Sequence, residues 1–222
     1  MLPSTSHPWA RLGAVAFTTA LMSLLPACGG GGGGGTTNAS NAPPTATFTF
    51  SPGSPVLMGA TVVQFSGNGA DPNGDPITYT WNFGDGSTGS GQNVSHVFTS
   101  AGTLSVVLTV ADSRGAQTTT QNAMVVKSLT GHWVDVDPRF QVDFVHNSGS
   151  GFTGSVTVSG FGRVSDITNG VVGDPRTVAF HRESFVSGFA TVDYRGTVDA
   201  TLNRMSVVAI QNAATSFDLT RQ

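Results

Sequence analysis

The sequence ITYTWNFGDG at residues 77–86 gives the strongest indication of the fold. Every second side chain in its first seven positions is apolar, and together these form one face: Ile77, Tyr79, Trp81 and Phe83. A period of two predicts a β-strand with one buried face, since successive side chains of a strand point to opposite sides. We therefore expect Trp81 and Phe83 to lie in a hydrophobic core.

A tight turn follows this strand. Gly84 and Gly86 permit a sharp hairpin, because glycine adopts positive φ without a steric cost. We expect Asp85, between them, to accept hydrogen bonds from backbone amides of the turn. We expect His96, further along the chain, to be a structural histidine and not a metal ligand.

The same alternation occurs before and after this strand. Its apolar positions are Ala46, Phe48 and Phe50 on the N-terminal side and Leu104, Val106, Leu108 and Val110 on the C-terminal side. Turn sequences separate the segments, as in DPNGDP at residues 71–76 and DSRG at residues 112–115. Short strands at this spacing predict a β-sandwich over residues 43–128.

Three segments of the predicted sandwich closely resemble the PKD (polycystic kidney disease) domain. They are WNFGDG at residues 81–86, HVF at residues 96–98 and AGTLSVVLTVAD at residues 101–112. Leu104 departs from the family pattern, in which an aromatic residue is more usual. The resemblance implies an immunoglobulin-like sandwich that serves as an extracellular spacer or as a module that binds protein or carbohydrate.

The acidic turn of this module has two interpretations. Asp71, Asn73 and Asp75 space three oxygen donors as in a calcium-binding loop. An EF-hand would have glycine at Pro76 and glutamate at Asn82, so the turn is not an EF-hand. Some PKD domains bind calcium, and the resemblance therefore leaves a weak calcium site open. The alternative is a plain Asx-rich turn, with no cofactor at all.

Residues 129–222 form a second predicted all-β domain. Strands are expected at residues 140–144, 152–158, 176–181, 189–194, 204–210 and 216–221. Short gaps between them predict an antiparallel meander, which closes into a small barrel or folds as a second sandwich. GHW at residues 131–133 and FDLTR at residues 217–221 resemble the small lipocalin-like barrels of bacterial lipoproteins. The many phenylalanines of this part leave open a carrier of a small apolar ligand.

No catalytic motif is apparent in this second domain. Its histidines and nearby acids are His132, His146, His181, Asp135, Asp137 and Asp143. None has a metal-ligand spacing such as HxxxH, and a GxSxG nucleophile motif is absent from the sequence. A simpler explanation is that these histidines and acids are opposite charges of neighbouring strands on a solvent-exposed outer face. We expect no catalytic residue and no enzyme, although PKD-like modules often accompany secreted hydrolases.

The first 27 residues predict a signal peptide. Arg11 precedes an uncharged, mostly apolar stretch at residues 12–25. This stretch is shorter than the roughly 20 residues that span a bilayer and fits the apolar region of a signal peptide. LPAC at residues 25–28 resembles the lipobox of bacterial lipoproteins.

The lipobox resemblance implies cleavage before Cys28, a lipid on its sulfur and fatty acylation of its new amino group. Cys28 is the single cysteine of the chain, and an unpaired thiol is a liability for an exported protein. A free thiol after ordinary cleavage is the alternative. Gly29, where an inner-membrane lipoprotein has aspartate, implies the outer membrane of the bacterial envelope.

Residues 28–42 predict a flexible tether. Seven consecutive glycines at residues 29–35 precede small polar residues, and none of these can bury a large apolar side chain. The root-mean-square reach of such a tether is roughly 20–24 Å. The net charge is −3 and Lys127 is the single lysine, which excludes the clustered basic surface of a nucleic-acid-binding protein. The sequence thus predicts a lipid-anchored, non-enzymatic protein with a protein or carbohydrate partner.

Overall fold

The computed structural model describes residues 40–147, 149–173, 176–187, 191–211 and 216–222. The predicted signal peptide, Cys28 and the glycine run lie outside the described residues. All regular elements of the described residues are strands. No helix in this part of the chain is long and apolar enough to cross a membrane. The all-β prediction is confirmed.

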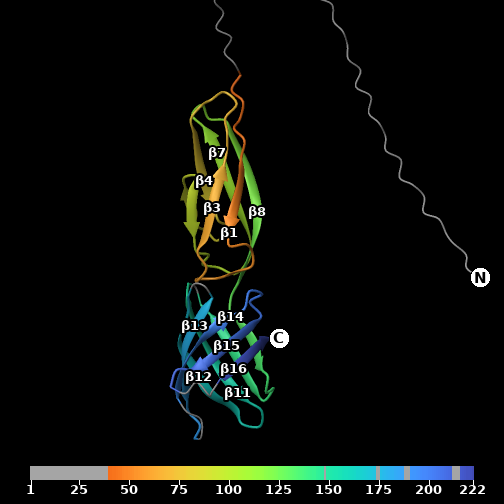
Figure 1. Cartoon of the computed structure of the whole chain (residues 1–222), viewed down its shortest axis with the longest axis vertical. Coiled ribbons are helices and arrows are strands. Elements are labelled where there is room, and N and C mark those ends of the chain that lie inside the picture. Colours follow the sequence, from red (N-terminus) through yellow and green to blue (C-terminus); the bar gives the residue numbers. More distant parts are fainter. Residues whose placement is uncertain (1–39, 148, 174–175, 188–190, 212–215) are drawn as a thin grey trace, which may run out of the picture. The chain divides into compact units, whose positions relative to one another are not determined.

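The first eight strands form two sheets (Figure 1). They are β1 (Thr47–Ser51), β2 (Val56–Leu57), β3 (Val63–Asn68), β4 (Ile77–Asn82), β5 (Thr88–Ser90), β6 (Asn93–His96), β7 (Gly102–Asp112) and β8 (Gln117–Lys127). One sheet has the order β1-β3-β6, and the other has the order β2-β8-β7-β4-β5. All pairs are antiparallel except β2 with β8.

Strand β4, which contains the alternating residues 77–82, contributes to the core between these sheets. Trp81 is fully buried and Phe83 is 2% exposed, as the alternation predicts. Their neighbours in the core come from both sheets and from the segment after β6, and include Phe48, Phe65, Phe98, Leu108 and Met124. The Trp81 Nε1 donates a hydrogen bond to the carbonyl oxygen of Gly91 at 2.8 Å, so its buried polar atom is satisfied.

The last eight strands close into a barrel (Figure 1). They are β9 (Gly131–Asp135), β10 (Phe140–His146), β11 (Gly151–Val158), β12 (Gly162–Gly173), β13 (Thr177–Ser184), β14 (Val192–Val198), β15 (Arg204–Ala209) and β16 (Ser216–Arg221). Each strand pairs antiparallel with the next, and β9 pairs with both β10 and β16. Of the two predicted architectures, the barrel is confirmed and the second sandwich is wrong.

The two ends of the barrel sequence meet at Trp133. Its indole is fully buried, and Nε1 donates to the carbonyl oxygen of Leu129 at 3.0 Å. The Arg221 guanidinium lies over the Trp133 ring, 5.0 Å from its centroid, and donates to the carbonyl oxygens of Ser128 and Thr130. Burial lowers the pKa of Arg221. These contacts hold the last strand against the first.

Side chains fill the interior of the barrel. Phe144, Phe152 and Phe180 contact one another at ring-centroid distances of 5.3 to 5.9 Å. Phe180 also stacks on Tyr194 at 5.3 Å. Among the described residues, the space beside Phe180 and Tyr194 measures about 20 Å³, roughly the room of one water molecule. Sites for small ligands measure about 300–1,000 Å³. The expected apolar-ligand carrier is therefore not supported.

Candidate functional site

Three carboxylates meet at one end of the sandwich. Asp71 and Asp75 lie in the loop between β3 and β4, and Asp112 is the last residue of β7. Each offers an oxygen atom, and these three atoms lie within 4.8 Å of one another. The strand register explains the arrangement, because Ile77 at the start of β4 lies opposite Asp112. We call Asp71, Asp75 and Asp112 the acidic group.

Local turns orient the carboxylates. The Oδ1 atom of Asp71 accepts hydrogen bonds from the backbone amides of Asn73 and Asp75, at 2.9 and 3.0 Å. The Oδ1 atom of Asp112 accepts from two backbone amides of the β7–β8 hairpin, at 2.8 and 2.9 Å. In Asp71 and in Asp112, one oxygen is therefore fixed by a turn and the other is left for different partners.

Three buried oxygen atoms, two of the acidic group and one of Asn41, have no hydrogen-bond donor among the described residues. Within the described chain they are Oδ1 of Asn41, Oδ2 of Asp71 and Oδ2 of Asp75. The last of these lies 3.2 Å from Nε of Arg114, which is an ion pair without hydrogen-bond geometry. The Asp112 Oδ2 accepts a hydrogen bond from the Asn41 Nδ2 at 3.0 Å. A buried carboxylate oxygen without a donor is unfavourable unless a cation binds it.

These residues fit a calcium ion. Calcium takes six to eight oxygen ligands, and carboxylates and amide oxygens are those it prefers. The acidic group supplies three carboxylates, and Asn41 adds an unpartnered amide oxygen. Burial raises the pKa of Asp112, but hydrogen bonds from Asn41 and the turn amides outweigh this and hold it below its usual value. The carboxylate is therefore charged at neutral pH.

The structure changes the membership of the set expected from the sequence. Asn73 is engaged elsewhere: its Oδ1 accepts from the Ala42 amide at 2.8 Å, and its Nδ2 donates to the Ser40 carbonyl oxygen at 3.4 Å. Asn73 therefore holds residues 40–42 and takes no part in the acidic group. Sequence reasoning missed Asn41, which it placed in the tether, and Asp112, which lies far along the chain. The pairing of β4 with β7 is the signal that leads to Asp112.

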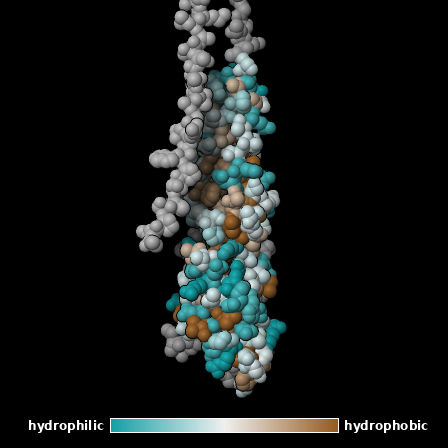
Figure 2. All heavy atoms as spheres, turned by 90° about the vertical axis from the view of Figure 1, so that its right-hand side faces the viewer, coloured by the Kyte–Doolittle hydropathy of each residue, from teal (hydrophilic) through white to brown (hydrophobic). Residues whose placement is uncertain are grey.

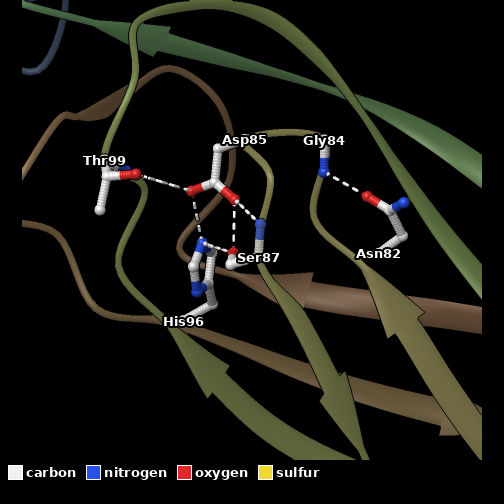
Figure 3. Close-up of polar contacts among 6 residues, drawn as sticks. All are labelled: Asn82, Gly84, Asp85, Ser87, His96 and Thr99. Carbon is white, nitrogen blue, oxygen red and sulfur yellow. Dashed lines mark hydrogen bonds and ion pairs between the residues drawn. The ribbon is translucent and has the colours of Figure 1, made fainter.

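The GDG turn builds a second polar cluster (Figure 3). The Asp85 side chain has no exposed surface. Its Oδ1 accepts hydrogen bonds from the amide of Ser87, at 3.1 Å, and from the Ser87 hydroxyl. Its Oδ2 accepts from the Thr99 amide at 3.1 Å and lies 2.8 Å from Nε2 of His96. Asp85 thus accepts from one amide of its own turn, that of Ser87, and joins this turn to the loop that contains Thr99.

This second cluster is a structural one. Burial raises the pKa of Asp85, but hydrogen bonds from Ser87, His96 and Thr99 outweigh it and hold the pKa well below its usual value. The His96 ring stacks on Phe83 at 4.0 Å. Ser87 and Asp85 both contact the same ring nitrogen of His96. A catalytic triad instead places its serine and its acid on opposite ring nitrogens, so this cluster lacks that geometry.

Gly84 and Gly86 have the backbone conformations that the turn requires. Their φ angles are +81° and +93°. The Gly84 amide donates to Oδ1 of Asn82 at 2.9 Å. A Cβ atom on Gly84 would lie 2.7 Å from the Ser105 carbonyl oxygen, whereas one on Gly86 would meet nothing within 4 Å. Position 84 therefore favours glycine for two reasons, its positive φ angle and the lack of room for a Cβ atom, whereas position 86 favours glycine only for its positive φ angle.

The barrel histidines and acids form separate pairs. His132 lies 2.8 Å from Asp143, and His181 lies 2.7 Å from Asp193. Both pairs join directly opposite residues of neighbouring strands. Asp137 instead pairs with Arg139 in its own turn. In the described parts of the chain, the acidic group of the sandwich is the one cluster of three potential metal ligands.

Two further candidates of the barrel serve its fold. Asp135 accepts hydrogen bonds from the amides of Val136 and Asp218, at 2.7 and 3.2 Å. The buried His146 accepts from the Leu129 amide at 3.0 Å through Nδ1, and its Nε2 lies 3.0 Å from the Gly149 carbonyl oxygen. Burial lowers the pKa of His146, against a smaller effect of the bond to Gly149. His146 thus fixes the entry into the barrel.

Comparison with known proteins identifies the sandwich. Residues 41–126 match the family model of the PKD domain. A microbial collagenase of Vibrio alginolyticus is 37% identical over 93 residues, which cover 42% of this chain and 11% of that protein. Collagenase ColA of Bacillus cereus is 46% identical over 66 residues, which cover 29% of this chain and 7% of that protein. The chain spans about a tenth or less of the length of these relatives.

Solved structures show weaker likenesses. The PKD1 domain of Vibrio anguillarum Epp is 29% identical, covers 40% of this chain and 98% of its own, and has a TM-score of 0.33. A structure described as carbohydrate-binding modules from the β-sandwich superfamily is 21% identical, covers 82% of this chain and 86% of its own, and has a TM-score of 0.38.

Proposed function

Because residues 41–126 form a PKD domain, we propose that the chain is a non-enzymatic envelope lipoprotein whose PKD domain is a calcium-bound spacer and interaction module. The observation that carries the proposal is the acidic group, in which the buried Oδ2 of Asp71 has no donor among the described residues. The other polar residues of the module that suggest chemistry, such as Asp85 and His96, are engaged in the fold itself. The similarity to the two collagenases covers only 11% and 7% of those proteins, so it leaves out most of each enzyme.

The proposed calcium ion has a mechanical role. It binds Asn41 together with Asp71, Asp75 and Asp112, so it fixes the point where the tether enters the sandwich. Asn73 supports the same segment through Ala42 and Ser40. Calcium would therefore order residues 40–42 against the sandwich.

The partner of the module is a protein or a carbohydrate. A pull-down of the purified chain on insoluble polysaccharides and on fibrillar collagen, with and without calcium, tests this part. We expect retention on one class of matrix and a loss of retention after chelation. Asp112→Asn is expected to mimic chelation, and Asp143→Asn, at an exposed carboxylate of the barrel, is the matched control. Absence of retention on every matrix would leave a spacer role and contradict the interaction role.

The lipid anchor rests on the lipobox resemblance of residues 25–28. Several acyl chains at about 0.8 kcal/mol for each buried CH₂ make an anchor that does not dissociate. Cell fractionation tests the proposal. The parent chain is expected in the membrane fraction, resistant to salt and released by detergent, and Cys28→Ser is expected in the soluble fraction. Ser40→Ala, near the end of the tether, is the control. Membrane retention of Cys28→Ser without any acyl mass on the parent would overturn the anchor.

A further inference from the structure

Two residues from the sandwich part of the chain lie in the hydrophobic core of the barrel. Leu57, the last residue of β2, is 1% exposed, and Ala60, in the loop that follows, is 6% exposed. Both belong to the cluster of buried side chains that also contains Trp133 and the interior of the barrel. Val56 and Met58, on either side of Leu57, belong to the core of the sandwich. Consecutive residues of one short segment therefore pack into two different cores.

The loop after β2 lies directly against the backbone of the β10–β11 turn. Gly59 has a φ of +70°, and a Cβ atom at this position would overlap the carbonyl oxygen of Gly149. Backbone hydrogen bonds hold the same loop on the sandwich. The Met58 amide donates to the Lys127 carbonyl oxygen at 2.9 Å, and the Gly59 amide donates to that of Phe98 at 2.9 Å. Position 59 therefore has no room for a side chain between the sandwich and the barrel.

A charged side chain makes a second contact, with the β14–β15 turn. Lys127, the last residue of β8, donates from Nζ to the Thr201 carbonyl oxygen at 2.9 Å and to Oδ1 of Asn203 at 3.2 Å. Oδ1 of Asp199 holds this turn by accepting from the Asn203 amide at 3.0 Å. Turns of an antiparallel meander alternate between the two ends of a barrel, so β10–β11 and β14–β15 share one end. The sandwich thus contacts one end of the barrel at two turns.

The connection between the sandwich and the barrel is short and held on both sides. Only residues 128–130 separate β8 from β9. Leu129 is fully buried in the barrel cluster. Its amide donates to Nδ1 of His146, and its carbonyl oxygen accepts from Nε1 of Trp133, both at 3.0 Å. The carbonyl oxygens on either side of Leu129 accept from Arg221. An interdomain hinge is ordinarily an exposed segment with few contacts, and this segment has the opposite character.

We call Leu57, Ala60 and Leu129 the seal. All three are buried in the barrel cluster, although Leu57 and Ala60 come from the loop region of the sandwich. On the face shown in Figure 2, hydrophobic residues lie as small separate groups among hydrophilic ones. Separation of the sandwich from the barrel would expose both leucines of the seal to water. The hydrophobic effect opposes this exposure in the same way as it opposes unfolding.

We propose that the seal makes the sandwich and the barrel one cooperative unit, in which the sandwich closes an end of the barrel and both unfold in a single step. Domains of one chain ordinarily move and unfold separately unless an apolar interface joins them. Residues 40–222 form one compact unit, which supports the proposal. The sandwich is then part of the fold of the barrel as well as a spacer. Neither calcium nor the lipid on Cys28 is needed for this coupling.

Hydrogen exchange mass spectrometry across a urea series tests the proposal, because it gives an unfolding midpoint for peptides of each part. The protein is the chain from residue 28 onward with Cys28→Ser, in the presence of a chelator. We expect peptides of the sandwich and of the barrel to share one midpoint in the parent. In Gly59→Ala, whose new Cβ atom overlaps Gly149, we expect two midpoints, with that of the barrel lower by about 0.5 M urea or more.

Gly115→Ala is the matched control. Gly115 lies in the β7–β8 hairpin of the sandwich with a φ of +95°, and a Cβ atom there would meet nothing within 4 Å. This change therefore has a similar conformational cost in the sandwich but leaves the contact with the barrel intact. We expect it to lower the midpoints of both parts by the same amount, because the two parts unfold together.

Three results would overturn the proposal. They are separate midpoints in the parent, a single midpoint in Gly59→Ala, and a Gly115→Ala variant in which only the sandwich midpoint falls. If Gly59→Ala does not fold, Lys127→Met takes its place, since it removes both bonds to the β14–β15 turn and is expected to separate the midpoints in the same direction. Because calcium and the lipid are absent, failure here leaves the proposed calcium site and the proposed anchor untouched.

Discussion

Asn41 donates a hydrogen bond from Nδ2 to Oδ2 of Asp112 across 3.0 Å, although 71 positions separate the two residues. The contact brings the entry of the sandwich to the end of β7, beside two further carboxylates. The other amide atom of Asn41, Oδ1, is buried without a donor among the described residues. A cation is the simplest partner for that oxygen, because every side-chain group in the acidic group is an acceptor.

Calcium is expected to stabilise the sandwich against heat. A ligand that binds only the folded state raises the unfolding midpoint in proportion to the logarithm of its concentration. Saturating calcium should raise the midpoint by about 5 °C or more, and a chelator should reverse the gain. Asn41→Ala should reduce the gain, and Asn73→Ala should leave most of it. An equal gain for parent and Asn41→Ala in differential scanning calorimetry would remove Asn41 from the site.

Asp85 is expected to stabilise the sandwich only while it is charged. Its pKa in the folded state lies below the unfolded value of about 3.9. The stabilisation is therefore complete above about pH 4 and is lost as the pH falls through the folded pKa. Asp85→Asn should lower the free energy of unfolding by about 3 kcal/mol at neutral pH. It should also reduce the loss of this free energy as the pH falls from 7 to 3. Urea unfolding near pH 7 and pH 3 measures both effects, and an unchanged loss between the two pH values would contradict this role.

His146 is expected to make the barrel sensitive to mild acid. Burial lowers its folded pKa below the unfolded value of about 6.5, and protonation of Nδ1 would break the bond from the Leu129 amide. Stability is therefore full above about pH 6.5 and falls, by up to about 1.4 kcal/mol per pH unit, until the folded pKa is reached. His146→Gln should abolish this loss, and the exposed His132→Gln should preserve it. Urea titrations near pH 7.5 and pH 5.5 make the comparison.

Alanine at the two turn glycines should have unequal effects. Gly86→Ala places a side chain in open space at positive φ and should cost about 1 kcal/mol. Gly84→Ala has the same conformational cost and also a Cβ atom 2.7 Å from the Ser105 carbonyl oxygen. Its cost should reach about 2 kcal/mol or more. Equal losses in denaturant unfolding would mean that the hairpin moves away from Ser105 freely.

Local patterns predicted the parts of this protein that depend on neighbours in sequence. The alternation of residues 77–83 placed Trp81 and Phe83 in the core, and GDG specified the turn around Asp85. The barrel followed from short strands with short gaps, because each strand then pairs with the next. The closed interior could not be predicted, since it depends on how Phe144, Phe152 and Phe180 pack across the barrel.

The acidic group was predicted only in part, for a related reason. Asp71 and Asp75 share one turn and are visible as a spacing in the sequence. Asp112 and Asn41 enter the region through strand pairing and through a segment that composition assigned to the tether. The spacing of residues in the sequence indicates which ligands share one loop, whereas the ligands of a cation come from several segments of the chain.

Calorimetric titration of the chain with calcium is the sharpest test of the proposed calcium site. We expect one calcium ion bound per chain, with binding abolished by Asp71→Asn or Asp112→Asn and retained in Asp143→Asn. A parent chain that binds no calcium at millimolar concentration would contradict the proposed site, as would equal calcium binding by the parent and both variants of the acidic group.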